Sequence, residues 1–506
     1  THITLISCMT QKVSKQAKQD IRSGNKTFDL EKTAESFSDW YDAIMDAAEI
    51  VDRRYPVKGC PVMRPYGFFM HNAIMREVED RYAEVDVHQA LFPTTIPESF
   101  LNKEEEHIKG FGAECFWIEK AGNDKLEERL ALRPTSETAI YYMFNKWVQS
   151  FRDLPLKVHQ TVTVFRYETK NTKPLIRVRE IPWNEAHTCH ATKQEALQMM
   201  DTYWQVCMRL FEEELCFTGK KLQRAPWDKF AGAEHTEVLD VIMPCGRVLQ
   251  TAGIHYLGQK FAKVFDINFL DQNNQKQFAE MTCCGVSTRV LACALSIHGD
   301  NKGLVLPPLI AQFQVVLIPC GGKKESEVME PLKEIAKKLQ AQKVRVFLDD
   351  SKQSMGEKLY YWEMKGAPLR IELGPRDLEA GKFILVSRDN MAKQTFELAN
   401  IVQVVQEQLA AIRDRMRVKA MQFHKDRETV CKTLEEVVEV ITKKGGFAKI
   451  PFFTMGEGAK EAEDIIKEKC GGAEIRGFWP GETCEGEVCV ATGKPATVWA
   501  YVARAY

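Results

Sequence analysis

The stretch VTVFRYETKNTKPLIRVREIPWNEAHTCH, residues 162–190, decides the fold class. Side chains on a strand alternate between its two faces, so Arg166 and Glu168 are expected on one face of a first strand. After the polar turn TKNTKP, a return strand is expected to place Arg177 and Arg179 on a common face. The segment therefore predicts an antiparallel hairpin that carries several arginines.

The same alternation places Trp183, Glu185 and His187 together further along the return strand. Two interpretations of the hairpin remain open at this point. It is either a cradle for a nucleoside triphosphate or a surface hairpin with salt bridges. The charges alone favour the surface hairpin, because exposed Arg–Glu pairs are common and weak.

The stretch LALRPTSETAIYYMF, residues 130–144, contains a helix start. Thr135 or Ser136 is placed as an N-cap, and Glu137 lies in the first helical turn. This pattern is typical of simple capping. It also fits a carboxylate that faces the ammonium group of a ligand.

Two later stretches, residues 246–261 and 283–308, add Gln250, His255 and Arg289. A lone His on an apolar face is usually a core residue, and a lone Arg at a helix start is usually solvated. Taken singly, these residues do not decide between structure and function.

The composition limits the class of protein. The 506 residues suggest three or four domains at about 150 residues each. Lys and Arg number 69 against 70 Asp and Glu, which excludes a strongly basic nucleic-acid coat protein and an acidic tail protein. No uncharged apolar run reaches about 18 residues, so no membrane association is expected. The 15 cysteines are an odd number without a disulfide framework, which predicts reduced thiols and a cytoplasmic location.

The pattern of elements predicts four segments. Residues 1–30 are expected to form a loosely attached extension. Residues 31–310 are expected to form one large domain, with helices over 36–51 and 68–82 and a strand over 85–93. The double proline in GLVLPP ends this domain. Alternating strands and helices over 311–411 predict an α/β domain, and 412–506 a Gly-rich α/β module.

Together the motifs resemble a known family. FRYE, the second arginine pair and GVSTR before GLVLPP resemble motifs 2 and 3 of class II aminoacyl-tRNA synthetases. RPTSE, WNEAH, KFAGAEHT, LGQKF and KGAPLRIELGPRD resemble the prolyl-tRNA synthetases of the eukaryotic and archaeal type. The resemblance extends from about Phe37 to Tyr506. It implies an α/β (α+β) fold with an antiparallel-sheet catalytic domain, an α/β anticodon-binding domain and a small C-terminal α/β module.

The resemblance also implies an activity. ATP and L-proline would give prolyl-adenylate, and the prolyl group would pass to the 3′ end of tRNA(Pro), with Mg²⁺ accompanying ATP. Motif 1, the helix after Pro65 and the strand reaching Pro93, would build a homodimer. The short segment between Glu180 and Gly285 leaves no room for an inserted editing domain.

For ATP, the resemblance implies contacts from both strands of the hairpin. Arg166 would hold the α-phosphate and the substrate carboxylate, Glu168 would bind the adenine amino group, and Arg177 would contact the outer phosphates. Arg289 would lie over the adenine, and Gln250 would contact the ribose and phosphates. Ile181 stands where a phenylalanine commonly packs on the adenine.

For proline, the resemblance implies a carboxylate for the ammonium group and flat walls for the ring. The proline-binding set would be Thr135, Glu137, Arg166, Trp183, Glu185, His187, Phe230, His255 and Ser287. Gly253 replaces a threonine that is common two residues before the pocket histidine. The family's final residue, here Tyr506, would fold back toward the active-site region.

In the anticodon-binding domain, the resemblance places the candidate base contacts at Lys358, Lys365, Arg370 and Glu372. In the C-terminal module, relatives hold zinc with four cysteines. This chain keeps Cys470, Cys484 and Cys489. Three thiols do not close a structural tetrahedral site, so no structural zinc is predicted.

Two alternatives to this assignment stay open. The first is a class II synthetase specific for another amino acid. The second is a catalytically inactive, synthetase-like tRNA-binding protein. Such proteins usually lose a motif arginine, whereas Arg166 and Arg289 are both present.

Overall fold

A computed structural model describes residues 28, 30–103, 114–168 and 171–506. The extension expected over residues 1–30 lies outside this range except for Phe28 and Leu30. The chain divides into two compact units. One contains residues up to 50, 64–70 and 298–418, and the other contains 51–63, 71–297 and 419–506. Helices α3 (Pro65–Glu84) and α13 (Ile401–Lys425) each contribute residues to both units.

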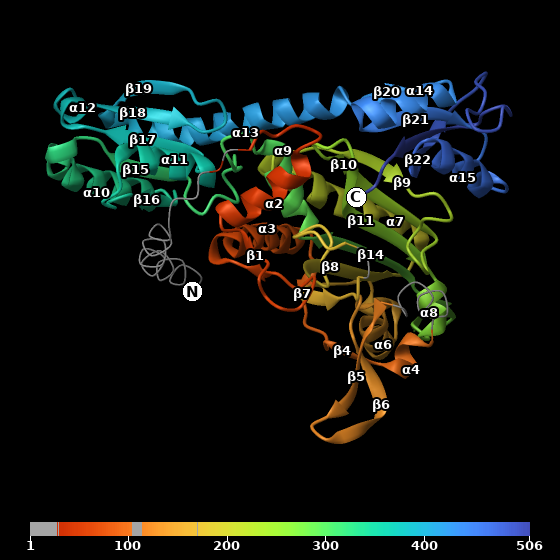
Figure 1. The fold of residues 1–506 in the computed structure, drawn as a ribbon. Helices are drawn as coiled ribbons and strands as arrows, with labels where there is room; N and C mark the ends of the chain where they lie inside the picture. Colours follow the sequence, from red (N-terminus) through yellow and green to blue (C-terminus); the bar gives the residue numbers. More distant parts are fainter. Residues whose placement is uncertain (1–27, 29, 104–113, 169–170) are drawn as a thin grey trace. The chain divides into compact units, whose positions relative to one another are not determined.

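The larger unit is built on an eleven-stranded sheet (Figure 1). Its strand order is β20-β21-β23-β22-β9-β10-β11-β14-β8-β7-β3. In chain order the strands are β3 (His88–Gln89), β7 (Leu156–Phe165), β8 (Glu180–His190), β9 (Lys220–Gln223), β10 (His235–Ile242), β11 (Val248–Gly258), β14 (Glu280–Ser287), β20 (Glu428–Val430), β21 (Phe447–Phe452), β22 (Glu474–Thr483) and β23 (Val498–Ala503).

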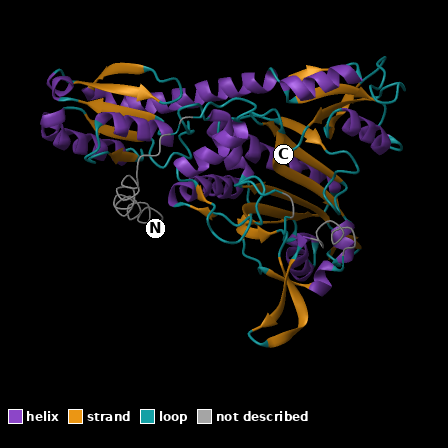
Figure 2. Cartoon of the chain, viewed as in Figure 1, coloured by secondary structure: helices purple, strands orange, loops and turns teal. Residues whose placement is uncertain are grey.

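Helices and smaller sheets complete this unit (Figure 2). They are β1 (Val51–Asp52), β2 (Val62–Met63), β4 (Thr95–Pro97), α4 (Glu98–Leu101), β5 (Phe116–Ala121), β6 (Asp124–Leu132), α6 (Glu137–Trp147), α7 (Lys193–Met208), α8 (Lys260–Val264), β12 (Asn268–Leu270), β13 (Lys276–Phe278), α9 (Arg289–His298), α14 (Leu434–Glu439) and α15 (Ala459–Lys469). Helix α7 packs across β8, β11 and β14 on the face where Cys284 meets Cys207.

The hairpin predicted over residues 162–190 is present, but its arginines lie elsewhere than expected. Strand β7 ends at Phe165 and β8 begins at Glu180, so Arg166 and Arg177 belong to the connecting segment. The alternation predicted for them was therefore wrong. The reason is that Leu175 and Ile176 are buried, 3% exposed each, and draw this segment back against the domain.

The other elements predicted within residues 31–310 agree with the structure in type but differ in length. The helix expected over 36–51 is α2 (Phe37–Ala47), and the one expected over 68–82 is α3. The strand expected over 85–93 shrinks to the two residues of β3. Strand boundaries depend on the pairing partner, here a short parallel contact with β7, which the local pattern does not contain.

The smaller unit contains a five-stranded sheet in the order β16-β15-β17-β18-β19. Its first three strands are parallel and its last two antiparallel, as βαβ crossovers followed by a hairpin require. Its elements are α2, β15 (Val315–Pro319), α10 (Glu325–Ala341), β16 (Val346–Leu348), α11 (Met355–Lys365), β17 (Leu369–Leu373), α12 (Pro375–Glu379), β18 (Lys382–Ser387) and β19 (Lys393–Glu397).

The C-terminal strands continue the eleven-stranded sheet instead of forming a separate one. Strand β22 pairs with β9 through Phe478 and Gln223. Gly477 permits this join, because a Cβ there would lie 2.3 Å from the carbonyl oxygen of Gln223. No helix among the described residues is long and apolar enough to cross a membrane.

Candidate active site

The central strands build the floor of a cavity from one row of side chains. Antiparallel register aligns Thr236 on β10 with His255 on β11, His255 with Cys283 on β14, and Cys283 with His187 on β8. Partners that lie opposite each other point to the same face of a sheet. The four side chains therefore form a continuous row across the floor.

A second row of paired residues lies beside the first, and its glycines leave space above the floor. Gly253 pairs with Gly285, Gly285 with Glu185, and Glu185 with Gln160. A Cβ at Gly253 would lie 3.0 Å from His255 Nε2. The two glycines thus leave space that a larger residue would fill.

The cavity has a volume of about 400 Å³. Every residue predicted to bind ATP or proline lies on it. These residues are Thr135, Glu137, Arg166, Glu168, Arg177, Ile181, Trp183, Glu185, His187, Phe230, Gln250, His255, Ser287 and Arg289. Residues far apart in sequence are therefore brought to one site, although the roles given to each stay predictions.

The turn before α6 supplies carboxylate chemistry instead of a simple cap. Ser136 occupies the N-cap position but forms no side-chain cap, and its hydroxyl donates to Glu185 Oε1 at 2.5 Å. Thr135 Oγ1 donates to Glu137 Oε2 at 2.5 Å. Glu137 is buried, so a cation in the cavity would meet a carboxylate that is already oriented.

A buried ion pair lies under this carboxylate. His187 Nε2 is 3.0 Å from Glu185 Oε2, and Gln160 Nε2 donates to Glu185 Oε1 at 2.8 Å. Burial alone would raise the pKa of Glu185, but hydrogen bonds from His187, Ser136 and Gln160 outweigh it and lower the pKa. Burial likewise opposes protonation of His187, and the contact with Glu185 overcomes it and raises its pKa. The pair is therefore charged and fixes the floor.

His255 has the opposite electrostatic character. Burial lowers its pKa to about 3, so its ring is neutral near pH 7. Thr236 Oγ1 lies 2.9 Å from His255 Nδ1, and the Phe230 ring lies 4.5 Å from the imidazole between centroids. The two rings form an uncharged wall beside the floor.

Three arginines, Arg166, Arg177 and Arg289, concentrate positive charge in the cavity. The guanidinium of Arg166 lies 5.6 Å from the Trp183 ring centroid, and its Nε donates to Pro134 O at 3.0 Å. Arg177 Nη1 donates to Glu168 Oε2 at 3.1 Å. Burial, together with repulsion from the other two arginines, lowers the pKa of Arg289 to about 10. A polyanion placed there would relieve this repulsion.

A β-bulge turns Gln250 into the cavity. Leu239 pairs with Ala252 and Asp240 with Gln250, so Thr251 is the extra residue of β11. A bulge shifts the alternation by one, which places Gln250 on the same face as Gly253. Its Oε1 accepts from Arg224 Nη2 at 2.9 Å. Sequence periodicity alone would have pointed Gln250 to the opposite face.

Several residues that were not predicted from the sequence also belong to the site. Arg224, Asp228, Thr236 and Cys283 all line the cavity. A signal for Cys283 was present, because Cys283, Gly285 and Ser287 alternate with period 2 on β14. The other three come from loops or neighbouring strands, and no local pattern distinguishes them.

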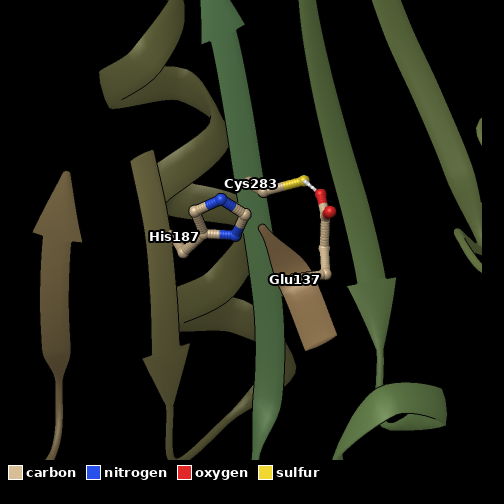
Figure 3. Close-up of side chains that lie close together, drawn as sticks. All are labelled: Glu137, His187 and Cys283. Carbon is tan, nitrogen blue, oxygen red and sulfur yellow. Dashed lines mark hydrogen bonds between the residues drawn. The ribbon is translucent and has the colours of Figure 1, made fainter. Parts of the chain in front are cut away.

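Glu137, His187 and Cys283 also form a group with metal-ligand chemistry (Figure 3). Their donor atoms lie within 4.8 Å of one another, which is close enough for one ion such as zinc. Hydrogen bonds already use these atoms: Cys283 Sγ lies 3.7 Å from Glu137 Oε1, and His187 Nδ1 lies 3.1 Å from the Tyr141 hydroxyl. Burial also raises the pKa of Cys283, which disfavours the thiolate a metal requires.

The four residues predicted to contact the anticodon are engaged inside the smaller unit. Lys358 is 1% exposed and donates to Asp349 O at 3.2 Å, and Lys365 donates to Ala48 O at 2.8 Å. Arg370 and Glu372 are hydrogen-bonded to each other at 3.0 Å. Base recognition by Lys358 or Lys365 would require the side chain to leave these buried contacts.

Comparison with known families divides the chain into three consecutive segments. Residues 116–298 match the tRNA synthetase class II core domain (G, H, P, S and T), residues 314–408 the anticodon binding domain, and residues 434–506 the prolyl-tRNA synthetase C-terminal domain. The fold is that of a class II aminoacyl-tRNA synthetase, and the predicted fold class is confirmed.

Individual relatives show to which family of class II synthetases the chain belongs. The proline–tRNA ligase of Methanopyrus kandleri is 40% identical over 480 residues, covering 93% of this chain and 96% of that protein. That of Methanosarcina mazei is 43% identical over 482 residues, covering 93% and 97%. The structure of Giardia lamblia prolyl-tRNA synthetase in complex with prolyl-adenylate has 54% identity and a TM-score of 0.93, covering 95% of this chain and all of that one. The chain belongs to the prolyl-tRNA synthetase family, the proline–tRNA ligases of the archaeal and eukaryotic type.

Proposed function

We propose that this chain activates L-proline with ATP and transfers the prolyl group to tRNA(Pro). In the first step a proline carboxylate oxygen bonds to the α-phosphorus, and the bond to the β-phosphate oxygen breaks to release pyrophosphate. In the second step a hydroxyl of the terminal adenosine of tRNA bonds to the acyl carbon, loses its proton, and AMP leaves. One observation carries the proposal: the oriented Glu137 carboxylate and the arginine cluster lie on one cavity.

The end near Glu137 suits proline. A secondary ammonium matches the buried carboxylate, to which Thr135 donates a hydrogen bond. The ring fits against Trp183, Phe230 and the neutral His255, because a small apolar ring is best bound by flat, uncharged walls. The charged Glu185–His187 pair and Ser287 support this end from the strands beneath.

The arginine end suits ATP. Displacement at phosphorus needs alignment and charge stabilisation more than a protein base. We assign Arg166 to the α-phosphate and the proline carboxylate, Arg177 to the outer phosphates, and Arg289 to the adenine face and γ-phosphate. Glu168 is assigned to the adenine amino group, and Ile181 packs against the ring.

Mg²⁺ bound with ATP would neutralise phosphate charge. The chain's residues fit this role, because Glu114 and Glu168 line the cavity next to Arg166 and Arg177. Both carboxylates stand at the end that we assign to the phosphates. We therefore propose them as the side chains that would hold the ion.

We propose that the enzyme carries no structural zinc. Cys470 and Cys489 are part of an apolar cluster in the C-terminal module, and burial raises the pKa values of Cys470 and Cys484. Likewise, we assign Glu137, His187 and Cys283 to proline binding instead of a metal. Elemental analysis of the purified protein is expected to find well below one zinc per chain. One tightly bound zinc would overturn this, and Cys283→Ser and Cys489→Ser would then locate it.

The proposal extends to a cytoplasmic homodimer. Strand β3 is the edge of the eleven-stranded sheet, and the adjacent Leu91 is 82% exposed. A second subunit would cover this edge. The cysteines in the described part of the chain are free thiols, which suits a reducing compartment. Light scattering after gel filtration is expected to give twice the chain mass, and the mass of a single chain would contradict the dimer.

The test of the main proposal is exchange of labelled pyrophosphate into ATP with each amino acid in turn. Proline is expected to support the exchange far better than threonine, serine, glycine or histidine. Preference for one of these would indicate a synthetase with another specificity. No exchange with any amino acid, from a folded protein that still binds tRNA, would indicate an inactive tRNA-binding relative.

A further inference from the structure

A buried chain of hydrogen bonds connects the C-terminal strands to the cavity. Asp240, 0% exposed, is at its centre. Arg224 binds it in a bidentate manner, with Nη1 to Oδ2 at 3.0 Å and Nη2 to Oδ1 at 2.9 Å. Arg476 of β22 donates from Nε to Oδ2 at 2.9 Å. One carboxylate on β10 thus joins an arginine of the cavity to an arginine of the C-terminal module.

Arg476 reaches Asp240 because β22 contains a bulge. Ile475 pairs with Val502 and Gly477 with Tyr501, so Arg476 is the extra residue between two successive partners on β23. A bulge of this kind redirects one side chain and often occurs next to an active site. The glycine that follows, with φ +145°, allows the close approach of β22 to β9.

Arg224 connects Asp240 to the cavity, which its side chain lines. Its Nη2 also donates to Gln250 Oε1 at 2.9 Å. With its oxygen held by Arg224, Gln250 turns its amide nitrogen toward Gly253, where it lies 3.1 Å from the position a Cβ would take. A donor facing the cavity is what a ribose hydroxyl or a phosphate oxygen needs. The hydrogen bond from Arg224 to Gln250 Oε1 therefore leaves the amide nitrogen of Gln250 to face the ligand.

The charged side chains of this hydrogen-bonded network hold one another in place. Asp240 is shared by two arginines, and Arg476 Nη1 donates to Glu474 Oε1 at 2.5 Å. Burial alone would raise the pKa of Asp240, but the two arginines outweigh it and lower the pKa. Arg224 Nη1 also donates to the carbonyl oxygen of Arg476. Without the Arg476 side chain, Oδ2 of Asp240 would be free to draw Arg224 away from Gln250.

We propose that Arg476 is a positioning residue for ATP binding: it holds Arg224 through Asp240, and Arg224 orients Gln250. The proposal rests on the proposed function, in which Gln250 contacts the nucleotide. It gives the C-terminal module a part in forming the nucleotide site. If Arg476 only joined β22 to β9, its loss would affect folding or stability. It would not change the KM for ATP more than the KM for proline.

The first experiment measures pyrophosphate exchange by Arg476→Met and Arg476→Lys. Arg476→Met is expected to raise the KM for ATP roughly tenfold, with the KM for proline changed less than about twofold. Arg476→Lys keeps the charge beside Asp240 and is expected to recover most of the loss. The control is Arg427→Met, which removes an arginine of the same module that lies 3.8 Å over the Phe423 ring. It is expected to leave both KM values unchanged.

The second experiment is a double-mutant cycle between Arg476 and Gln250, with Gln250→Ala as the second change. If Arg476 acts through Gln250, Arg476→Met is expected to raise the KM for ATP much less in the Gln250→Ala variant than in the wild-type protein. Independent, multiplicative effects would overturn the proposal, and so would an unchanged KM for ATP in Arg476→Met. Failure of the wild-type protein to exchange with proline would instead contradict the proposed function. If Arg476→Met does not fold, the cycle is run with Arg476→Gln, which also removes the charge beside Asp240.

Discussion

Arg177 donates a hydrogen bond from Nη2 to the backbone oxygen of Tyr506, with 2.8 Å between the atoms and 329 positions between the residues. The last residues are held in place by β11: Tyr506 N donates to Val248 O at 3.0 Å, and Val248 N donates to Arg504 O at 2.8 Å. The final segment therefore ends at an arginine of the cavity, as the family resemblance implied for Tyr506.

Removal of Tyr506 should weaken ATP binding. Arg177 would lose the acceptor that fixes its second nitrogen, and one such hydrogen bond contributes about 0.5–1.5 kcal/mol. The KM for ATP in pyrophosphate exchange is expected to rise several-fold. Tyr506→Phe is the matched control, because it keeps the backbone oxygen and removes only the hydroxyl. Equal kinetics for the deletion and the wild type would show that Arg177 does not depend on this contact.

Arg166→Ala should nearly abolish adenylate formation. Removing one preorganised donor from a site of charge development costs about 3–4 kcal/mol, or roughly 10²–10³-fold in rate. Pyrophosphate exchange measures this loss, and circular dichroism checks the fold. Arg129→Ala is a suitable control, because Arg129 lies on β6 and pairs with Glu98 of α4 at the surface. Near-normal exchange in folded Arg166→Ala would remove Arg166 from the mechanism.

Glu137→Gln should affect proline far more than ATP. The amide keeps the size of the side chain but removes the charge that pairs with the ammonium group. The loss of a buried charge pair costs 2 kcal/mol or more, so the KM for proline should rise at least about 30-fold. Calorimetry should find ATP binding within about twofold of wild type. A comparable loss of ATP affinity would indicate that Glu137 maintains the structure of the whole cavity and is not specific to proline.

Gly253→Ala should lower activity by crowding two cavity side chains. A Cβ there would lie 3.0 Å from His255 Nε2 and 3.1 Å from Gln250 Nε2, so both must move by a few tenths of an ångström. Misplacement of binding groups on this scale is expected to reduce kcat/KM about tenfold. Gly356→Ala is the control, because its Cβ would meet nothing within 4 Å. Unchanged kinetics for Gly253→Ala would show that the cavity adjusts freely.

The fold should lose stability as the pH falls from about 6.5 to about 4. Burial lowers the pKa values of His71, His159, His190 and His424 to about 4 and that of His255 to about 3. In this window the unfolded chain binds protons that the folded chain does not, so the unfolding free energy decreases. Each histidine contributes up to about 1.4 kcal/mol per pH unit.

Thermal unfolding, followed by tryptophan fluorescence between pH 7.5 and 5, measures this dependence. The Tm should begin to fall as the pH passes below about 6.5 and should continue to fall down to pH 5. His190→Asn removes one of the buried histidines and should make the dependence shallower. A Tm that does not change over this range would mean that these histidines become protonated in the folded protein.

Features that depend on near neighbours in the chain could be predicted from the sequence. Trp183, Glu185 and His187 share the cavity face of β8 as their period-2 spacing predicts, and Arg289 begins α9 as expected. The alternating strands and helices predicted over 311–411 are also present, from β15 to α13. These features could be predicted because alternation and helix starts are properties of a few consecutive residues.

The way in which distant segments complete the site could not be predicted, because it depends on the assembled sheet. The bulge at Thr251 sets the face of Gln250, because a bulge arises from pairing with β10 and not from the local sequence. The buried Leu175 and Ile176 move Arg177 off the strand and into the reach of Tyr506. Arg224 and Arg476 meet at Asp240 only after β22 has joined β9. Such contacts depend on strand order and register, which are fixed when the whole sheet assembles.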